Sequence, residues 1–259
     1  EVRSTNIDNK DFTWTSTFMM THNKNKVLKL ADVPQYFTGN YYVVKEGYSL
    51  GTICLREYAG VDPENGLPMY YSNVEKDGVR SREKVYDPND AVMVPLENIY
   101  PTVSGSISNT FRYKYFDLMF NFTYSLGGHS YDDAMWVLQD DGKSATAPKS
   151  IELRRRWQKP GDKTDIPRYV YGQNYGGWWH SSRGIHSTDH LRLKSLVLGV
   201  NAPDSWIKKL GLSRARVYFS GSNLLTWAKY TQYDPELMGT VGFEIPPLKT
   251  FSFGLEIGL

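Results

Sequence analysis

The sequence has 259 residues, a formal net charge of +2 and a mean hydropathy of −0.49. That length holds one large all-β unit or two ordinary domains, and the near-neutral charge gives no electrostatic case for nucleic-acid binding. No stretch approaches the roughly 18 consecutive apolar residues of a transmembrane helix. This criterion does not detect membrane-spanning strands, because their apolar residues alternate with polar ones.

Segments in which apolar and polar residues alternate recur along the chain and predict β-strands, because successive side chains of a strand point to opposite faces. About eight such segments occur, over residues 12–20, 50–61, 67–72, 103–113, 116–124, 191–200, 214–225 and 250–259. The link around Lys114 fits a tight hairpin, and the link around Lys208 suggests one helical turn. The alternation slips near Ser195, where we expect a β-bulge.

The last segment has one unbroken apolar face, while Ser252 and Glu256 lie on the other. About 9–11 residues is the length that a tilted strand needs to cross a bilayer, and a sequence ending on such a strand is typical of outer-membrane barrels. We therefore expect an antiparallel transmembrane β-barrel fold with one face toward lipid and the other toward the lumen. The residues expected to face lipid are Phe116, Leu118, Phe120, Phe122, Phe251, Phe253, Leu255, Ile257 and Leu259.

The lengths of the expected connections also alternate. Short links lie around Asn65, Lys114 and Lys208, whereas long ones cover about 23–49, 73–101, 127–190 and 229–249. Long loops without regular structure are uncommon in compact domains unless they are functional. Short turns on one side and long loops on the other favour a bacterial outer-membrane barrel, with a soluble β-sandwich as the alternative.

Two acidic pairs, Asp132-Asp133 and Asp140-Asp141, suggest the carboxylates of a glycosidase. Adjacent side chains generally point apart, and loop carboxylates are common on any surface, so we expect no catalytic site. The segment 62–66 (DPENG) is expected to be a turn, because it lacks the oxygen ligands and distal glutamate of a calcium loop.

His180, His186 and His190 fall in one predicted loop. Two of them are four residues apart, but the intervening sequence argues against the helix that would bring them together on zinc. Cys54 is the only cysteine and is interpreted as a small packed residue. We therefore expect neither a metal site nor a cofactor.

Four motifs carry a resemblance to a known family. They are residues 62–66 (DPENG), residues 156–162 (RWQKPGD), residues 191–194 (LRLK) with 198–199 (LG), and residues 223–227 (NLLTW) followed by 233–236 (YDPE). In sequence and spacing, nearly end to end, these segments resemble the C-terminal part of the SusC/RagA family of TonB-dependent outer-membrane transporters. Val200, where the family often has Tyr, and Leu259, where Phe is commoner, are mild departures.

The resemblance implies a 22-stranded barrel with an N-terminal plug in its lumen, of which residues 1–259 would be the C-terminal portion. Glu1 is not a start methionine, so we expect a removed leader or, as the strand count favours, a longer chain. The family implies outer-membrane import of an oligosaccharide or a peptide, energised by TonB through the missing N-terminal region. The alternatives are a soluble carbohydrate-binding or hydrolytic β-domain and a non-transporting surface barrel or adhesin.

The family also implies a SusD-like surface lipoprotein that covers the barrel mouth as a lid. Such a lid would rest on the long loops, and the loop 127–190 is crowded with aromatic rings that suit a ligand or an interface. The rings expected to contact ligand or lid are Trp136, Trp157, Tyr175, Trp178 and Trp179. The alternative is that these rings pack their own loop.

Overall fold

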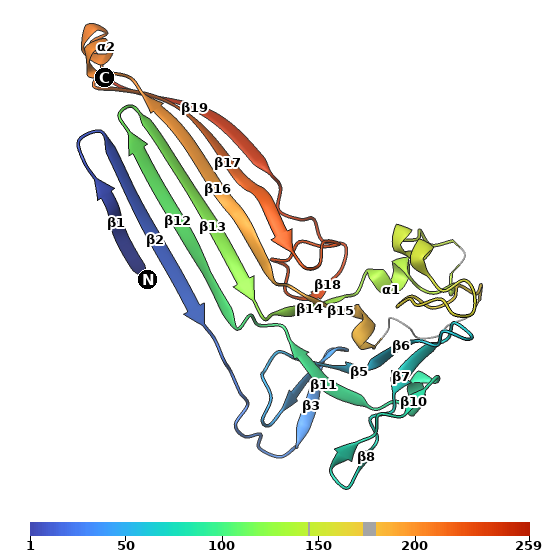
Figure 1. The fold of residues 1–259 in the computed structure, drawn as a ribbon. Helices are drawn as coiled ribbons and strands as arrows, with labels where there is room; N and C mark the ends of the chain where they lie inside the picture. The colour runs from blue at the N-terminus through green and yellow to red at the C-terminus, as the bar shows by residue number, and fades with distance from the viewer. Residues whose placement is uncertain (145, 173–179) are drawn as a thin grey trace.

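In the computed structural model, which describes residues 1–144, 146–172 and 180–259, seven long strands form one antiparallel sheet (Figure 1). Its strands, in spatial order, are β1 (Val2–Asp8), β2 (Phe12–His22), β12 (Val103–Tyr113), β13 (Phe116–Leu126), β16 (His190–Asn201), β17 (Arg214–Ala228) and β19 (Thr250–Gly258). The spatial order is the chain order, so the sheet is an up-and-down meander with β1 and β19 at its edges.

The sheet confirms the all-β fold and corrects two details of the prediction. Residues 50–61 and 67–72 form strands of separate small sheets, so they are not part of the long meander. The meander instead begins with β1, which the sequence pattern missed because only Val2 and Ile7 are apolar and a bulge between Thr5 and Ile7 breaks the alternation. The bulge expected near Ser195 is confirmed, since the register shifts between Leu193 and Ser195.

The connections of the long strands are short at one end and long at the other. Short links join β1 to β2, β12 to β13 around Lys114, and β16 to β17 through the predicted helical turn α2 (Asp204–Lys209). The long loops run from β2 to β12, from β13 to β16 and from β17 to β19. The turn around Asn65 therefore lies inside the first long loop, and the third short link is the one that precedes Phe12.

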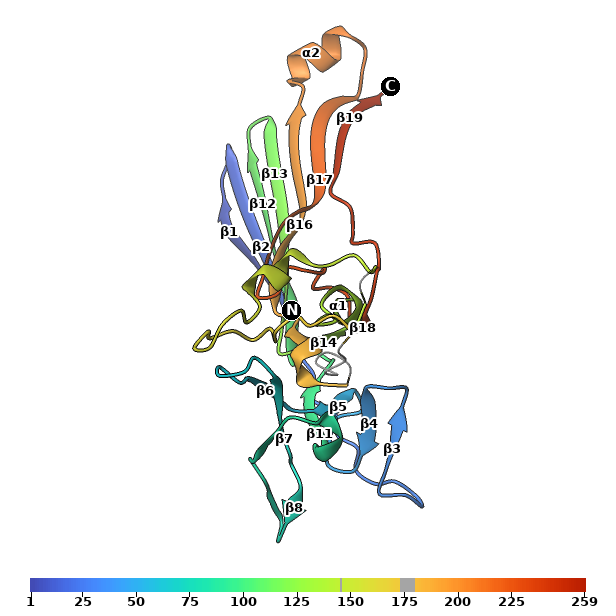
Figure 2. The ribbon, with the colours of Figure 1, turned by 90° about the vertical axis from the view of Figure 1, so that its right-hand side faces the viewer.

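The long loops carry the remaining elements, which gather beyond one end of the long strands while α2 stands at the other (Figures 1 and 2). Their strands are β3 (Gln35–Thr38), β4 (Tyr42–Lys45), β5 (Thr52–Arg56), β6 (Tyr58–Val61), β7 (Pro68–Tyr71), β8 (Glu75–Lys76), β9 (Val79–Arg80), β10 (Lys84–Val85), β11 (Met93–Asn98), β14 (His129–Asp132), β15 (Ile185–Ser187) and β18 (Gly239–Val241). Short helical segments are α1 (Met135–Leu138) and 3₁₀ turns at Pro88–Asp90, Ile151–Arg155 and Ser182–Gly184.

The buried apolar core lies in this loop region. Tyr41, Ile53, Leu55 and Tyr131 form its centre, drawn from the first and second long loops, and the Tyr41 and Tyr131 rings stack with centroids 4.2 Å apart. Cys54 is buried beside them, as expected of a small packed residue. Within the described ranges, no helix has the length and apolar character needed to cross a bilayer.

Candidate functional site

The register of the long sheet sorts side chains into two opposite faces. One row across it pairs Phe111 with Leu118, Leu118 with Leu198, Leu198 with Phe219, and Phe219 with Phe253. The neighbouring row pairs Arg112 with Asp117, Asp117 with Gly199, Gly199 with Tyr218, and Tyr218 with Gly254. Because pairing partners share a face, one face is almost continuously apolar and the other carries charges, hydroxyls and glycines.

The apolar face is uncovered over much of its area. The Phe253 side chain is 82% exposed, and Phe116, Phe251, Leu255 and Ile257 are exposed as well. Leu118, Phe120 and Phe122 are half-buried by their neighbours in the same face. An exposed apolar face of this extent marks a surface that something other than water covers.

The polar face carries paired charges at both ends of the strands. At the short-turn end, Arg216 contacts Asp117 at 2.6 Å and Glu256 at 3.2 Å. At the loop end, the Arg192 side chain, only 1% exposed, contacts Asp234 at 2.6 Å and Glu236 at 3.2 Å. Asp234 and Glu236 belong to the loop between β17 and β19, so these ion pairs fasten that loop onto the polar face of the sheet.

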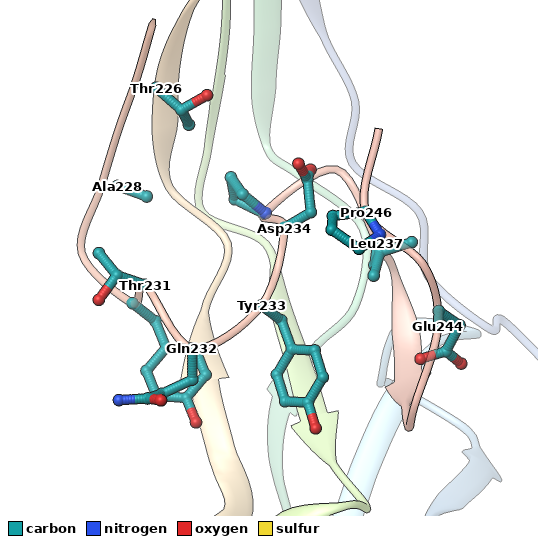
Figure 3. Close-up of a pocket in the computed structure, with 11 residues that line it drawn as sticks. Thr226, Ala228, Thr231, Gln232, Tyr233, Asp234, Leu237, Glu244 and Pro246 are labelled. Carbon is teal, nitrogen blue, oxygen red and sulfur yellow. The ribbon is translucent and has the colours of Figure 1, made fainter. Parts of the chain in front are cut away.

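A hollow of about 380 Å³ lies at the loop end of β17, beside the segment that follows it (Figure 3). Thr226 and Ala228 of β17 line one side, and Tyr233, Leu237 and Glu244 of the loop are among the residues around it. Thr226 pairs with Arg192 and Ala228 with His190, so both lie on the polar face. The hollow therefore opens on the side that would face a barrel lumen.

Asp132 joins the second and third long loops. Its carboxylate accepts a hydrogen bond from the Tyr230 hydroxyl at 2.6 Å and one from the backbone N–H of Met135 at 3.0 Å. Burial raises the pKa of the Asp132 carboxyl above its usual range. Its neighbour Asp133 accepts a hydrogen bond from Tyr41 of the first long loop. These two carboxylates thus connect all three long loops.

The second acidic pair is also engaged in loop packing. Lys149 contacts Asp140 at 2.6 Å, and Arg183 contacts Asp141 at 2.7 Å with both side chains almost completely buried. Burial raises the pKa of the Asp141 carboxyl, and the Arg183 charge opposes that effect. The geometry assigns all four carboxylates to holding the loops.

The three histidines have separate environments. The His186 ring stacks on Tyr230 with centroids 3.7 Å apart, and burial lowers the pKa of His186 to about 4. The His180 ring packs edge-on against Tyr41, and the Nδ1 atom of His190 lies 2.8 Å from the carbonyl oxygen of Thr188. Each ring therefore packs a different part of the loop region.

Trp157 is the predicted contact residue whose side chain the structure describes. Its indole Nε1–H donates to the carbonyl oxygen of Pro63 at 2.9 Å, and its ring lies against Gly66. The RWQKPGD and DPENG motifs, far apart in sequence, therefore pack on one another. For Trp157 the structure thus shows a contact within the loop region, as the loop-packing alternative expects. An additional contact of this ring with ligand or lid stays a prediction.

For the other predicted contact residues, the structure describes no side chain. Tyr175, Trp178 and Trp179 lie outside the described residues, and of Trp136 only the backbone, within α1, is described. Sequence reasoning missed the acidic contacts of Asp132, Asp234 and Glu236 with their distant partners. The alternation over residues 191–200 predicted a strand there, but no sequence signal identified the partners of Arg192.

Known proteins with related sequences are TonB-dependent receptors, although no family model matches the chain. TonB-dependent receptor P3 of Formosa agariphila is 28% identical, over 99% of this chain and 28% of its own length. TonB-dependent receptor SusC of Bacteroides thetaiotaomicron is 25% identical, over 97% of this chain and 25% of its own length. Structures of the RagAB peptide transporter, and of the RagAB importer in its closed-closed state, share the fold with TM-scores of 0.85 and 0.87 at 23% identity.

The chain is thus similar, over nearly all of its residues, to TonB-dependent receptors of the SusC/RagA type. It spans about a quarter of the length of these relatives. The match to the RagAB structures covers 99% of this chain and 28% of the RagAB chains. The seven-stranded sheet accordingly has the fold of a section of an outer-membrane barrel of this type. The lipid-facing and lid-facing assignments of single residues remain predictions.

Proposed function

We propose that this chain forms part of the wall of an outer-membrane importer that takes up an oligosaccharide or a peptide and is energised through TonB. The observation that carries the proposal is the two-faced sheet with short turns at one end and long, mutually fastened loops at the other. This is the geometry of a barrel wall whose apolar face meets lipid and whose loops stand outside the cell. The related TonB-dependent receptors support the same function.

The apolar face also argues against the soluble alternative. A soluble β-domain would have to expose the row from Phe111 to Phe253 to water, at a cost of about 25 cal/mol for each Å² of apolar surface left uncovered. The engagement of the acidic pairs in loop packing removes the particular basis for a hydrolytic site. A non-transporting surface barrel would have the same wall, so transport itself must decide between it and an importer.

Uptake by cells that express the complete receptor tests the proposal. We expect recovery of the receptor in the detergent-soluble membrane fraction and uptake of labelled nutrient that is lost when TonB is deleted. Unchanged uptake without TonB would contradict the importer. Recovery in the aqueous fraction without detergent would instead favour a soluble domain.

The cargo class is proposed from the two kinds of relative. The structures that share the fold are of a peptide transporter, and SusC is a TonB-dependent receptor related in sequence. The hollow beside β17 offers the Tyr233 ring, the Gln232 amide and the Glu244 carboxylate, chemistry that suits a sugar or a peptide. Competition for uptake between an oligosaccharide mixture and a peptide mixture tests which class is carried.

A SusD-like lipoprotein is proposed as the partner on the long loops. Replacing Trp157, Trp178 and Trp179 together with alanine should reduce lipoprotein co-purification or ligand binding, because buried Trp residues usually dominate an interface. Trp206→Ala is the matched control, since α2 lies at the opposite end of the sheet. Normal binding of both lid and ligand by the triple variant would show that these rings only pack their own loop.

A further inference from the structure

A second hollow, of about 350 Å³, lies at the short-turn end of the sheet. Its floor contains one row of the apolar face: Phe116 pairs with Val200, Val200 with Val217, and Val217 with Leu255. All four side chains are exposed. The hollow therefore continues the apolar face as its last row before the turns.

Helix α2 forms the other wall of this hollow. Trp206 of α2 lines it together with Ala202 and Pro203, and the Trp206 side chain is 64% exposed. The link that carries α2 is anchored at its base, where the Ala202 N–H donates to the Ala215 carbonyl oxygen at 2.8 Å. The backbone thus holds an indole ring at the edge of the apolar face, at the level where Trp is enriched in membrane proteins.

The same helix carries two unneutralised positive charges. Lys208 and Lys209 lie in its last turn, both are exposed, and neither has an ion-pair partner among the described residues. The nearby arginines differ, because Arg214 and Arg216 both contact Glu256. Two free lysines next to an apolar hollow complement a molecule with a hydrocarbon chain and an anionic head.

We propose that this hollow binds a phospholipid of the periplasmic leaflet, with an acyl chain along the row from Phe116 to Leu255 and an anionic phosphate headgroup at Lys208 and Lys209. Short turns are the periplasmic side of an outer-membrane barrel, which places α2 at that leaflet. The hollow continues the face that meets lipid, and each lysine near an anionic lipid surface favours binding about fivefold. The proposal rests on the membrane orientation and is independent of cargo and import.

Native mass spectrometry of the complete receptor, purified in mild detergent and supplied with phosphatidylglycerol or phosphatidylcholine, tests the site. We expect wild-type receptor to retain phosphatidylglycerol in preference to phosphatidylcholine. Val217→Trp, which fills the hollow, should reduce retention of both lipids about tenfold, as should removal of the wall in Trp206→Ala. The double variant Lys208→Glu/Lys209→Glu should lose the preference for phosphatidylglycerol by at least about fivefold.

Lys10→Glu is the control for added negative charge, because Lys10 lies in the short link between β1 and β2 and outside the lining of the hollow. It should retain lipid as the wild type does, and the heat-induced shift of the folded barrel on gels should be the same for every variant. Equal retention by wild type, Val217→Trp and Trp206→Ala would overturn the site. A preference for phosphatidylglycerol that survives in the double glutamate variant would overturn the headgroup assignment.

Discussion

The long sheet and the loop region are stabilised by different means. In the sheet, alternation and backbone pairing place each side chain, and the apolar residues form an exposed face opposite the charged one. In the loop region, the apolar core around Tyr41 and Tyr131 is inside, and buried charges such as Asp141 and Arg183 join segments distant in sequence. The sheet therefore depends on its surroundings for stability, whereas the loop region supplies its own core.

The strongest test of this difference removes one partner of a buried charge pair. Asp141→Ala should destabilise the loop region by about 3–5 kcal/mol, because it leaves the Arg183 charge buried without its carboxylate. Hydrogen exchange should show the loss in the loops, with protection of the long strands unchanged. The double variant Asp141→Leu/Arg183→Met should recover most of the stability. An equal loss of protection in the sheet would contradict the separation of the two regions.

The corresponding test of the sheet introduces a charge on its apolar face. Phe253→Arg should destabilise the folded barrel in lipid vesicles by about 2–4 kcal/mol, because Phe253 lies on the apolar face about midway along β19. Ser252→Arg is the matched control, since Ser252 pairs with Ser220 on the polar face and should lose much less. Urea unfolding in vesicles measures both variants. Equal tolerance would refute the assignment of Phe253 to lipid.

This difference also explains how much of the structure the sequence predicts. The alternation around Phe116 and Phe253 is local, so it correctly predicted both strands and which of their side chains share a face. The same pattern failed for β1, where a bulge breaks the alternation. It also placed residues 50–61 and 67–72 in the wrong sheet, because a period of two does not identify a strand's neighbours. The contacts of Arg192 with Asp234 and Glu236 link residues more than 40 positions apart, and no local pattern reports them.

A test of the contact between two sequence motifs has a smaller expected effect. Gly66 has φ +75°, and an added Cβ would lie 2.5 Å from ring atoms of Trp157. Gly66→Ala should therefore cost about 1–3 kcal/mol through backbone strain and displacement of the ring. Gly161→Ala is the matched control, because φ is +92° there but no atom lies within 4 Å of the added Cβ. Proteolysis of the loop should be faster in Gly66→Ala than in Gly161→Ala if the ring contact matters.

The smallest effect is a pH dependence that belongs to the loop region alone. The pKa of His186 falls from 6.5 to about 4 on burial, so undocked loops bind a proton before docked ones do. Docking should therefore weaken as pH falls from about 6.5 towards 4, by less than about 1 kcal/mol between pH 7.5 and 6. His186→Phe keeps the stacking on Tyr230 and should abolish this loss, which hydrogen exchange of residues 127–189 measures.

The Asp132 carboxyl changes loop docking in the opposite direction as pH falls. Burial raises its pKa, so its protonation on acidification favours the docked loops. The phenylalanine variant should accordingly show unchanged or greater protection on acidification, and loss of protection equal to that of the wild type would contradict the role of His186.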